Sequence, residues 1–294
     1  MNRSPALRRV LLICIKGCGV ILFLWILSRI DRAQLVHALA HASLPLVFIG
    51  WCLFPVIYLL KSWRWHVLVT RAGVVQSFEM SFKTYCSALF LGMITPGNAG
   101  EAMKIAYLRS AGSPLKDATL LTVLDRLFDV FWIGLFALPS VFFLLRDRFL
   151  VLTLTLIAIG LCSVLALGIV QRMFGGLETL LREGLRWKPH VITLCNWAVY
   201  YVQLLIFARA FGIDVPLLPF VAIMTIAGSA SLLAVAPAGL GTRDAVVLYF
   251  FTAYAVPPSL AVAFSFSVFI LTLAGSLIGG YCLLQLPVSK EKNS

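Results

Sequence analysis

Charge is scarce in this chain. Only 12% of its 294 residues are Asp, Glu, Lys or Arg, whereas 61% are hydrophobic, and the mean hydropathy is +0.98. This composition lies far outside the range of soluble globular domains. The lack of charge therefore excludes a soluble domain and predicts an all-α polytopic membrane protein, formed by residues 1–294 as one integral membrane domain.

Patterns that mark several other functions are also absent. The 24 basic residues are scattered over short polar gaps, without the basic stripe or aromatic platform of a nucleic-acid site. None of the seven cysteines forms a Cys-x-x-Cys pair, which argues against a redox or zinc motif. No nucleophile and base pair, metal ligand set or nucleotide loop is visible. We therefore expect no nucleic acid, no metal, no cofactor and no enzyme activity.

Six apolar runs are long enough to cross about 30 Å of hydrocarbon. They lie near residues 9–28, 44–66, 118–145, 149–171, 190–211 and 259–286. The first could be a signal peptide, but about 20 apolar residues with no small-x-small cleavage site favour a retained span. Two further apolar regions, 78–109 and 217–254, are interrupted by proline and glycine. Each can form two spans, or one re-entrant hairpin that enters and leaves on the same side.

The distribution of basic residues orients the chain. With a cytoplasmic N-terminus and two re-entrant hairpins, cytoplasmic segments hold fifteen Lys and Arg, outer segments six, and apolar runs three. The positive-inside rule requires this asymmetry, so both termini are expected in the cytoplasm, although re-entrance itself is not decided. Residues 172–188 resemble a cytoplasmic interfacial helix, and Arg64 is expected to snorkel to lipid phosphates at the end of the second span.

The two halves of the chain resemble each other. The segment that starts at Arg71 parallels the one that starts at Arg209, and Pro96 parallels Pro237. A unit with three crossings and one hairpin crosses an odd number of times, so its second copy is inverted. We therefore expect an inverted repeat, with one broken hairpin entering from each membrane face. The expected repeats are residues 1–145 and 149–286.

The two interruptions read TPGNAGE at 95–101 and APAGLGTRD at 236–244. Proline removes a helical hydrogen bond and glycine permits unusual backbone angles, so lipid alone cannot surround such a segment. The interrupting residues are Pro96, Gly97, Asn98, Gly100, Pro237, Gly239 and Gly241. A helix that starts after such a break directs free N–H groups and its positive dipole end into a cavity, and this arrangement favours an anion.

Charged residues follow both breaks. Glu101 and Lys104 follow the first, one helical turn apart, and Arg243 and Asp244 follow the second. The acids can act simply as caps of the new helices. A cation at a helix start opposes the helix dipole, so we expect Arg243 to have an anionic partner.

A third group of charges lies inside the run TLLTVLDRLFDVFWIGL. Asp125 and Asp129 share a helix face, with Arg126 between them, at depths of roughly 10 and 16 Å at 1.5 Å per residue. An unpaired charge there costs about 2.5 to 3.5 kcal/mol. Lys104 or Arg243 could balance the excess negative charge. These residues are either a structural ion cluster or part of a transport site, and in both cases they face the bundle interior.

Three motifs together carry a family resemblance. PGNAGEAMKIAYL, LDRLFD and PAGLGTRDAVVLYF resemble motifs of the lysylphosphatidylglycerol synthase transmembrane region and flippase-like family of prokaryotic membrane proteins, over about residues 50–285. Asp replaces the commoner Glu at Asp125 and Asp244. The resemblance implies functional roles for Glu101, Lys104, Asp125, Arg126, Asp129, Gly241, Arg243 and Asp244. Members that synthesise aminoacylated phospholipid carry an additional soluble catalytic domain, so the resemblance implies the membrane part alone.

The resulting hypothesis is a flippase-like protein of the prokaryotic inner (plasma) membrane. Arg243 and the broken helix starts would hold phosphate, and Glu101, Asp125 and Asp129 would bind a cationic headgroup or a coupling proton. The resemblance implies a phospholipid or a polyisoprenoid- or hopanoid-type lipid as substrate, and lipid-biosynthesis enzymes as partners. The alternatives are a membrane-embedded enzyme with Glu101 or Asp125 as general base, an accessory subunit of lipid or glycan biosynthesis, and a secondary transporter of a small charged solute.

Overall fold

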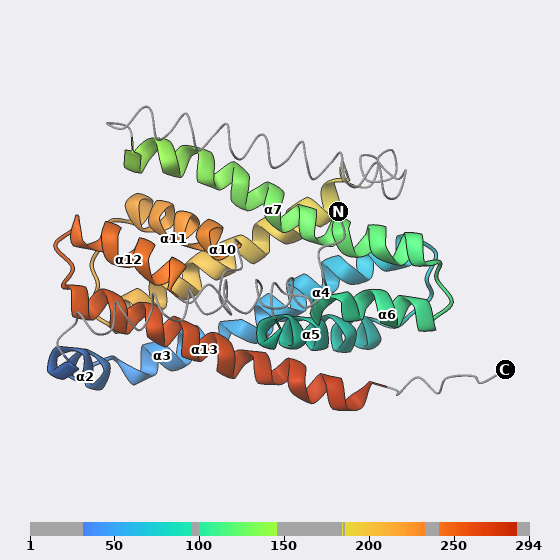
Figure 1. Cartoon of the computed structure of the whole chain (residues 1–294), viewed down its shortest axis with the longest axis horizontal. Coiled ribbons are helices and arrows are strands. Elements are labelled where there is room, and N and C mark those ends of the chain that lie inside the picture. Colours follow the sequence, from blue (N-terminus) through green and yellow to red (C-terminus); the bar gives the residue numbers. More distant parts are fainter. Residues whose placement is uncertain (1–31, 96–99, 146–183, 185, 233–240, 287–294) are drawn as a thin grey trace, which may run out of the picture.

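The computed structural model describes residues 32–95, 100–145, 184, 186–232 and 241–286. In these ranges all regular elements are helices, so the expected all-α class is confirmed (Figure 1). The expected spans 9–28 and 149–171 and nearly all of the interfacial helix 172–188 lie outside the described residues. The same holds for Pro96, Gly97, Asn98, Pro237 and Gly239.

The helices fall into two sequential groups. The first group is α2 (Arg32–Ala40), α3 (Leu44–Trp51), α4 (Leu53–Arg71), α5 (Phe78–Ile94), α6 (Met103–Ser110) and α7 (Leu115–Leu145). The second group is α10 (Trp187–Ala210), α11 (Leu217–Leu232), α12 (Thr242–Thr252) and α13 (Pro258–Gln285). In the described part of the chain, four helical stretches are long and apolar enough to cross a membrane. They are Leu44–Arg71, Leu115–Leu144, Trp187–Ala210 and Pro258–Gln285, so four of the six expected spans coincide with candidate membrane-spanning helices.

Both sequence interruptions separate two helices. The first lies between α5 and α6, and the second between α11 and α12. Gly100 lies so close to α5 that an added Cβ would come within 2.2 Å of the Leu91 carbonyl carbon. Gly241 has a φ of 84°, and its N–H donates to the Asp244 carboxylate at 2.7 Å. A glycine is therefore required after each break, for close approach at Gly100 and for the left-handed backbone at Gly241.

The two groups of helices pack across each other. α5 packs mainly on α13, α11 mainly on α7, and α4 on α10; Figure 1 shows α5 beside α13. The contact between α5 and α13 is close, since a Cβ on Gly279 would lie 2.1 Å from the Cys86 carbonyl oxygen. One hydrophobic core lies mainly among α10–α13 and another among α4–α7. Large apolar side chains such as Leu284, 85% exposed, cover the outside, as expected for a surface in contact with lipid.

Candidate functional site

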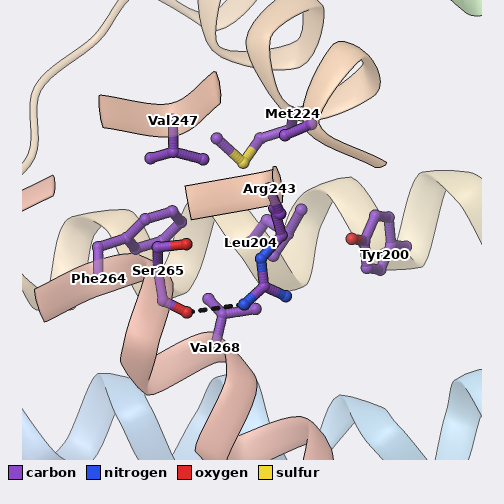
Figure 2. A pocket seen from close by; sticks show the side chains of 9 residues that line it. Tyr200, Leu204, Met224, Arg243, Val247, Phe264, Ser265 and Val268 are labelled. Carbon is purple, nitrogen blue, oxygen red and sulfur yellow. Dashed lines mark hydrogen bonds between the residues drawn. The ribbon is translucent and has the colours of Figure 1, made fainter. Parts of the chain in front are cut away.

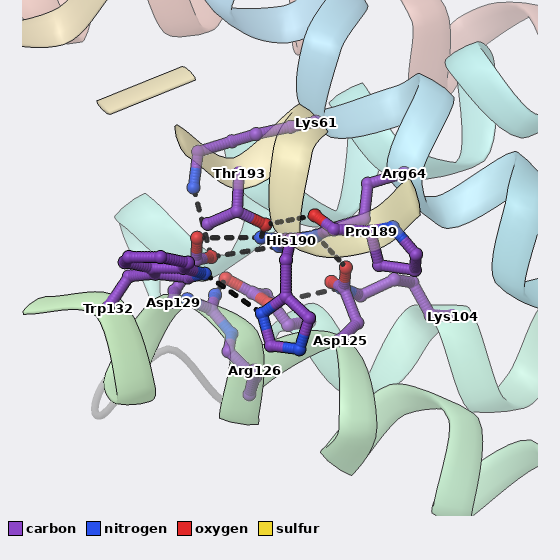
Figure 3. A network of polar contacts seen from close by, with 11 residues as sticks. Lys61, Arg64, Lys104, Asp125, Arg126, Asp129, Trp132, Pro189, His190 and Thr193 are labelled. Carbon is purple, nitrogen blue, oxygen red and sulfur yellow. Dashed lines mark hydrogen bonds and ion pairs between the residues drawn. The ribbon is translucent and has the colours of Figure 1, made fainter. Parts of the chain in front are cut away.

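Arg64 is the centre of a buried ion network that joins α4 to α7 and α10 (Figure 3). Its Nε donates to Asp125 Oδ1 at 2.9 Å, and its Nη1 and Nη2 donate to Asp129 Oδ1 and Oδ2 at 2.8 and 3.0 Å. Nη1 also donates to Thr193 Oγ1 on α10 at 3.0 Å. Because the planar guanidinium matches the carboxylate fork, the pair with Asp129 is bidentate. The expectation that Arg64 snorkels to lipid was wrong, since Arg64 is only 1% exposed.

Lys104 pairs with the second carboxylate oxygen of Asp125, the one that Arg64 does not contact. Its Nζ lies 2.8 Å from Asp125 Oδ2 and 3.4 Å from Glu101 Oε2. The rings of Trp65 and Tyr85 lie beneath the ammonium, with centroids at 5.0 and 4.5 Å. These aromatic faces favour a cation that is removed from water. Lys104 is thus one of the cations that balance the acids of α7, as the sequence suggested.

Two further cations close the network at its more exposed edge. Lys61 Nζ lies 3.0 Å from Asp129 Oδ2, and Arg126 pairs with Glu101. The side chains of Lys61 and Arg126 are 19% and 33% exposed; we call these two residues the rim cations. The ion network comprises Lys61, Arg64, Glu101, Lys104, Asp125, Arg126 and Asp129. Counted over the described residues alone, its four cations and three acids leave one excess positive charge.

The inner part of the ion network is saturated with partners. Asp125 receives Arg64 on one oxygen and Lys104 on the other, while both oxygens of Asp129 bind Arg64. Removing one partner from a buried pair typically costs about 3–5 kcal/mol. The inner pairs therefore hold α4, α6 and α7 together, and the rim cations are the part that can exchange partners.

His190, on α10, lies beside the network. Its Nδ1 accepts a hydrogen bond from Trp132 Nε1 at 3.1 Å, and its Nε2 lies 2.6 Å from the Gly184 carbonyl oxygen. Indole can only donate, so the ring proton of His190 sits on Nε2. The ring also meets Phe128 edge-on at 4.9 Å. No pattern in the sequence predicted the contact between His190 and Phe128 or the hydrogen bond from Arg64 to Thr193.

The second pair of motif charges forms a separate centre on α12 and α13. Asp244 caps α12 through Gly241 and accepts a hydrogen bond from Ser265 Oγ. Arg243 Nη2 donates to the Ser265 carbonyl oxygen at 2.9 Å and lies 3.7 Å from Asp244 Oδ1. Arg243 also lines a small pocket (Figure 2). Its partners in the described part of the chain lie on α12 and α13, so Arg243 does not balance the acids of α7.

The sequence did contain a signal for the missed cations. Lys61 and Arg64 are three residues apart, on one face of α4, and α4 continues to Arg71. A span that ends at residue 66 places Arg64 at the membrane surface, whereas the observed helix continues for about two turns beyond Arg64. A longer estimate of the second span would have marked both residues as buried charges.

These features define a class, the polytopic α-helical membrane proteins with charges buried inside membrane-spanning helices. The chain belongs to the family of the lysylphosphatidylglycerol synthase TM region, whose model matches residues 8–280. It is also similar to a UPF0104 membrane protein from Methanothermobacter thermautotrophicus, with 21% identity over 83% of this chain and 84% of that protein. The expected family is thereby confirmed.

Proposed function

We propose that the protein translocates a lipid or lipid-linked headgroup between the leaflets of the prokaryotic inner membrane, and that the headgroup is anionic. The observation that carries this proposal is the excess positive charge of the ion network, together with the partial exposure of its rim cations. A buried excess charge is costly unless it is compensated. An anionic headgroup supplies that compensation while it is bound.

Partner exchange at the rim costs little. When Lys61 releases Asp129, that acid keeps its bidentate bonds to Arg64. When Arg126 releases Glu101, that acid keeps Lys104 at 3.4 Å. A phosphate that accepts hydrogen bonds from both rim cations therefore leaves no buried acid without a cation.

The acids of α7 have a different role from the expected one. Asp125 and Asp129 are already paired with Arg64, so we assign them to holding the cations, instead of binding a cationic headgroup or a proton. For the same reason we propose translocation and no enzyme activity. Glu101 and Asp125, the candidate general bases, are ion-paired.

The helix contacts fit an inverted repeat. Under the repeat, α5 corresponds to α11 and α7 to α13, and the observed packing of α5 on α13 matches that of α11 on α7. We propose that both broken segments are re-entrant and that both termini are cytoplasmic. Alternating access would then move one repeat against the other around the charged centre. The substrate would be a phospholipid or a polyisoprenoid- or hopanoid-type lipid, and enzymes of lipid biosynthesis would be the partners.

Reconstitution tests the proposal. Liposomes carry fluorescent phosphatidylglycerol or polyprenyl phosphate, and a membrane-impermeant quencher reports the fraction in the outer leaflet over time. We expect movement with the wild-type protein, and an about ten-fold loss with Lys61→Gln or Arg126→Gln. Losing one charge-assisted hydrogen bond is worth about 1.5–3 kcal/mol, and 1.4 kcal/mol is ten-fold.

Lys83→Gln is the matched control. Lys83 is 21% exposed, close to the 19% of Lys61, and it pairs with Glu79 one turn away on α5. Its replacement should leave translocation unchanged. No movement of either lipid above protein-free liposomes would contradict the proposal. Uptake of a labelled soluble anion without lipid movement would instead identify a solute transporter.

A further inference from the structure

Arg243 presents an unused hydrogen-bond donor inside the protein. The residue is only 9% exposed, and its Nε has no hydrogen-bond partner among the residues that the structure describes. A buried donor without a partner costs about 1–3 kcal/mol, more for a charged group, so such a group needs an explanation. The side chain lines a pocket between α10, α11, α12 and α13 (Figure 2). This donor thus points to a ligand.

The neighbouring acid does not satisfy Arg243. Both oxygens of Asp244 are engaged, one by Gly241 N–H and the other by Ser265 Oγ. The distance from Arg243 Nη2 to Asp244 Oδ1 is 3.7 Å, which is too long for a hydrogen bond. Asp244 is thus held as a helix cap that balances the charge of Arg243 at 3.7 Å without accepting a hydrogen bond from it, and the Nε donor remains unused.

The other walls of the pocket are mostly apolar. They are Tyr200, Leu204, Met224, Ala227, Val247, Phe264, Ser265 and Val268. The empty space holds about one water molecule, which suits one oxygen atom and no larger group. An oxygen that carries negative charge and belongs to a molecule with apolar parts matches both the guanidinium and these walls.

We propose that the pocket around Arg243 is a second, separate binding site for one oxyanion group, the phosphate or carboxylate of an amphiphilic molecule. One oxygen enters the pocket and accepts from Arg243 Nε, and the rest of the ligand lies outside the pocket. This inference requires binding only, so it stands whether or not the ion network translocates lipid. The ion network and the pocket would each take one copy of an acidic lipid.

Native mass spectrometry of the purified full-length protein tests the site, because it counts bound lipid copies. The probes are dioleoylphosphatidic acid, dioleoylglycerol, which has the same chains without the oxyanion, and inorganic phosphate as competitor. Arg243→Gln should lose one copy of phosphatidic acid, with an about ten-fold weaker retention of that copy. Ala227→Leu, which fills the pocket and keeps Arg243, should lose the same copy.

Arg209→Gln is the control, because Arg209 is exposed and pairs with Asp214; it should bind as the wild-type protein does. Displacement of the Arg243-dependent copy by inorganic phosphate would assign the site to free oxyanions, and no displacement would assign it to lipid. Either result supports the site. Unchanged retention in both Arg243→Gln and Ala227→Leu overturns it, and so does equal retention of dioleoylglycerol. Binding at the rim cations is read separately from Lys61→Gln and Arg126→Gln.

Discussion

Replacement of Arg64 by Met tests whether the inner network holds the helices together. Arg64 donates four hydrogen bonds, three to Asp125 and Asp129 and one to Thr193. Removing one partner of a buried ion pair costs about 3–5 kcal/mol. In the variant Asp125 keeps Lys104 and Asp129 keeps Lys61. Because each acid retains one cation, we expect the lower end, about 3 kcal/mol.

A loss of about 3 kcal/mol should lower the melting temperature by roughly 6–12 °C, at 2–4 °C per kcal/mol for a chain of this size. Intrinsic tryptophan fluorescence during heating in detergent measures the change. Arg209→Met removes an exposed arginine, 54% exposed at its side chain, and should shift the melting temperature by less than about 2 °C. An equally small shift for Arg64→Met would refute the reasoning, because Arg64 would then contribute no more than a surface charge.

Two further variants test the local structure at the two ends of α5. Gly100→Ala forces a methyl group to within 2.2 Å of the Leu91 carbonyl carbon and should lower the free energy of unfolding by about 1–3 kcal/mol. The control Gly134→Ala meets nothing within 4 Å and should be neutral or slightly stabilising. Equal melting temperatures for the two variants would contradict the close approach. Ser77→Ala removes the hydrogen bond that Met80 N–H donates to Ser77 Oγ at the start of α5, and it should lower the free energy of unfolding by about 1 kcal/mol, as measured by thermal unfolding. An unchanged melting temperature would show that this N-cap does not stabilise the helix.

The fold class and part of the site could be predicted because they depend on local sequence. Four spans follow from apolar length alone, and the breaks follow from proline and glycine. The burial of Asp125 and Asp129 also follows, because charges inside a span avoid lipid. Both residues are buried, at 0% and 7% exposure.

The partners of the buried charges could not be predicted in the same way. Arg64 is more than 60 residues from Asp129 in the chain, and only the packing of α4 near α7 brings them together. Arg243 was a candidate partner for the acids of α7. It was placed elsewhere because α12 packs on α11 and α13. Helical periodicity gives the face of a charge, but the choice of facing helix depends on tertiary packing.

The two halves place different charges at corresponding positions. Each polar centre forms where the helix after a break meets the next long helix, α6 with α7 and α12 with α13. In the first half, α7 supplies the acid Asp125 to Lys104. In the second half, α13 offers Arg243 only the neutral Ser265. If the proposed inverted repeat holds, the two centres are reached from opposite faces, and the two proposed anion sites then differ in the charge that surrounds them.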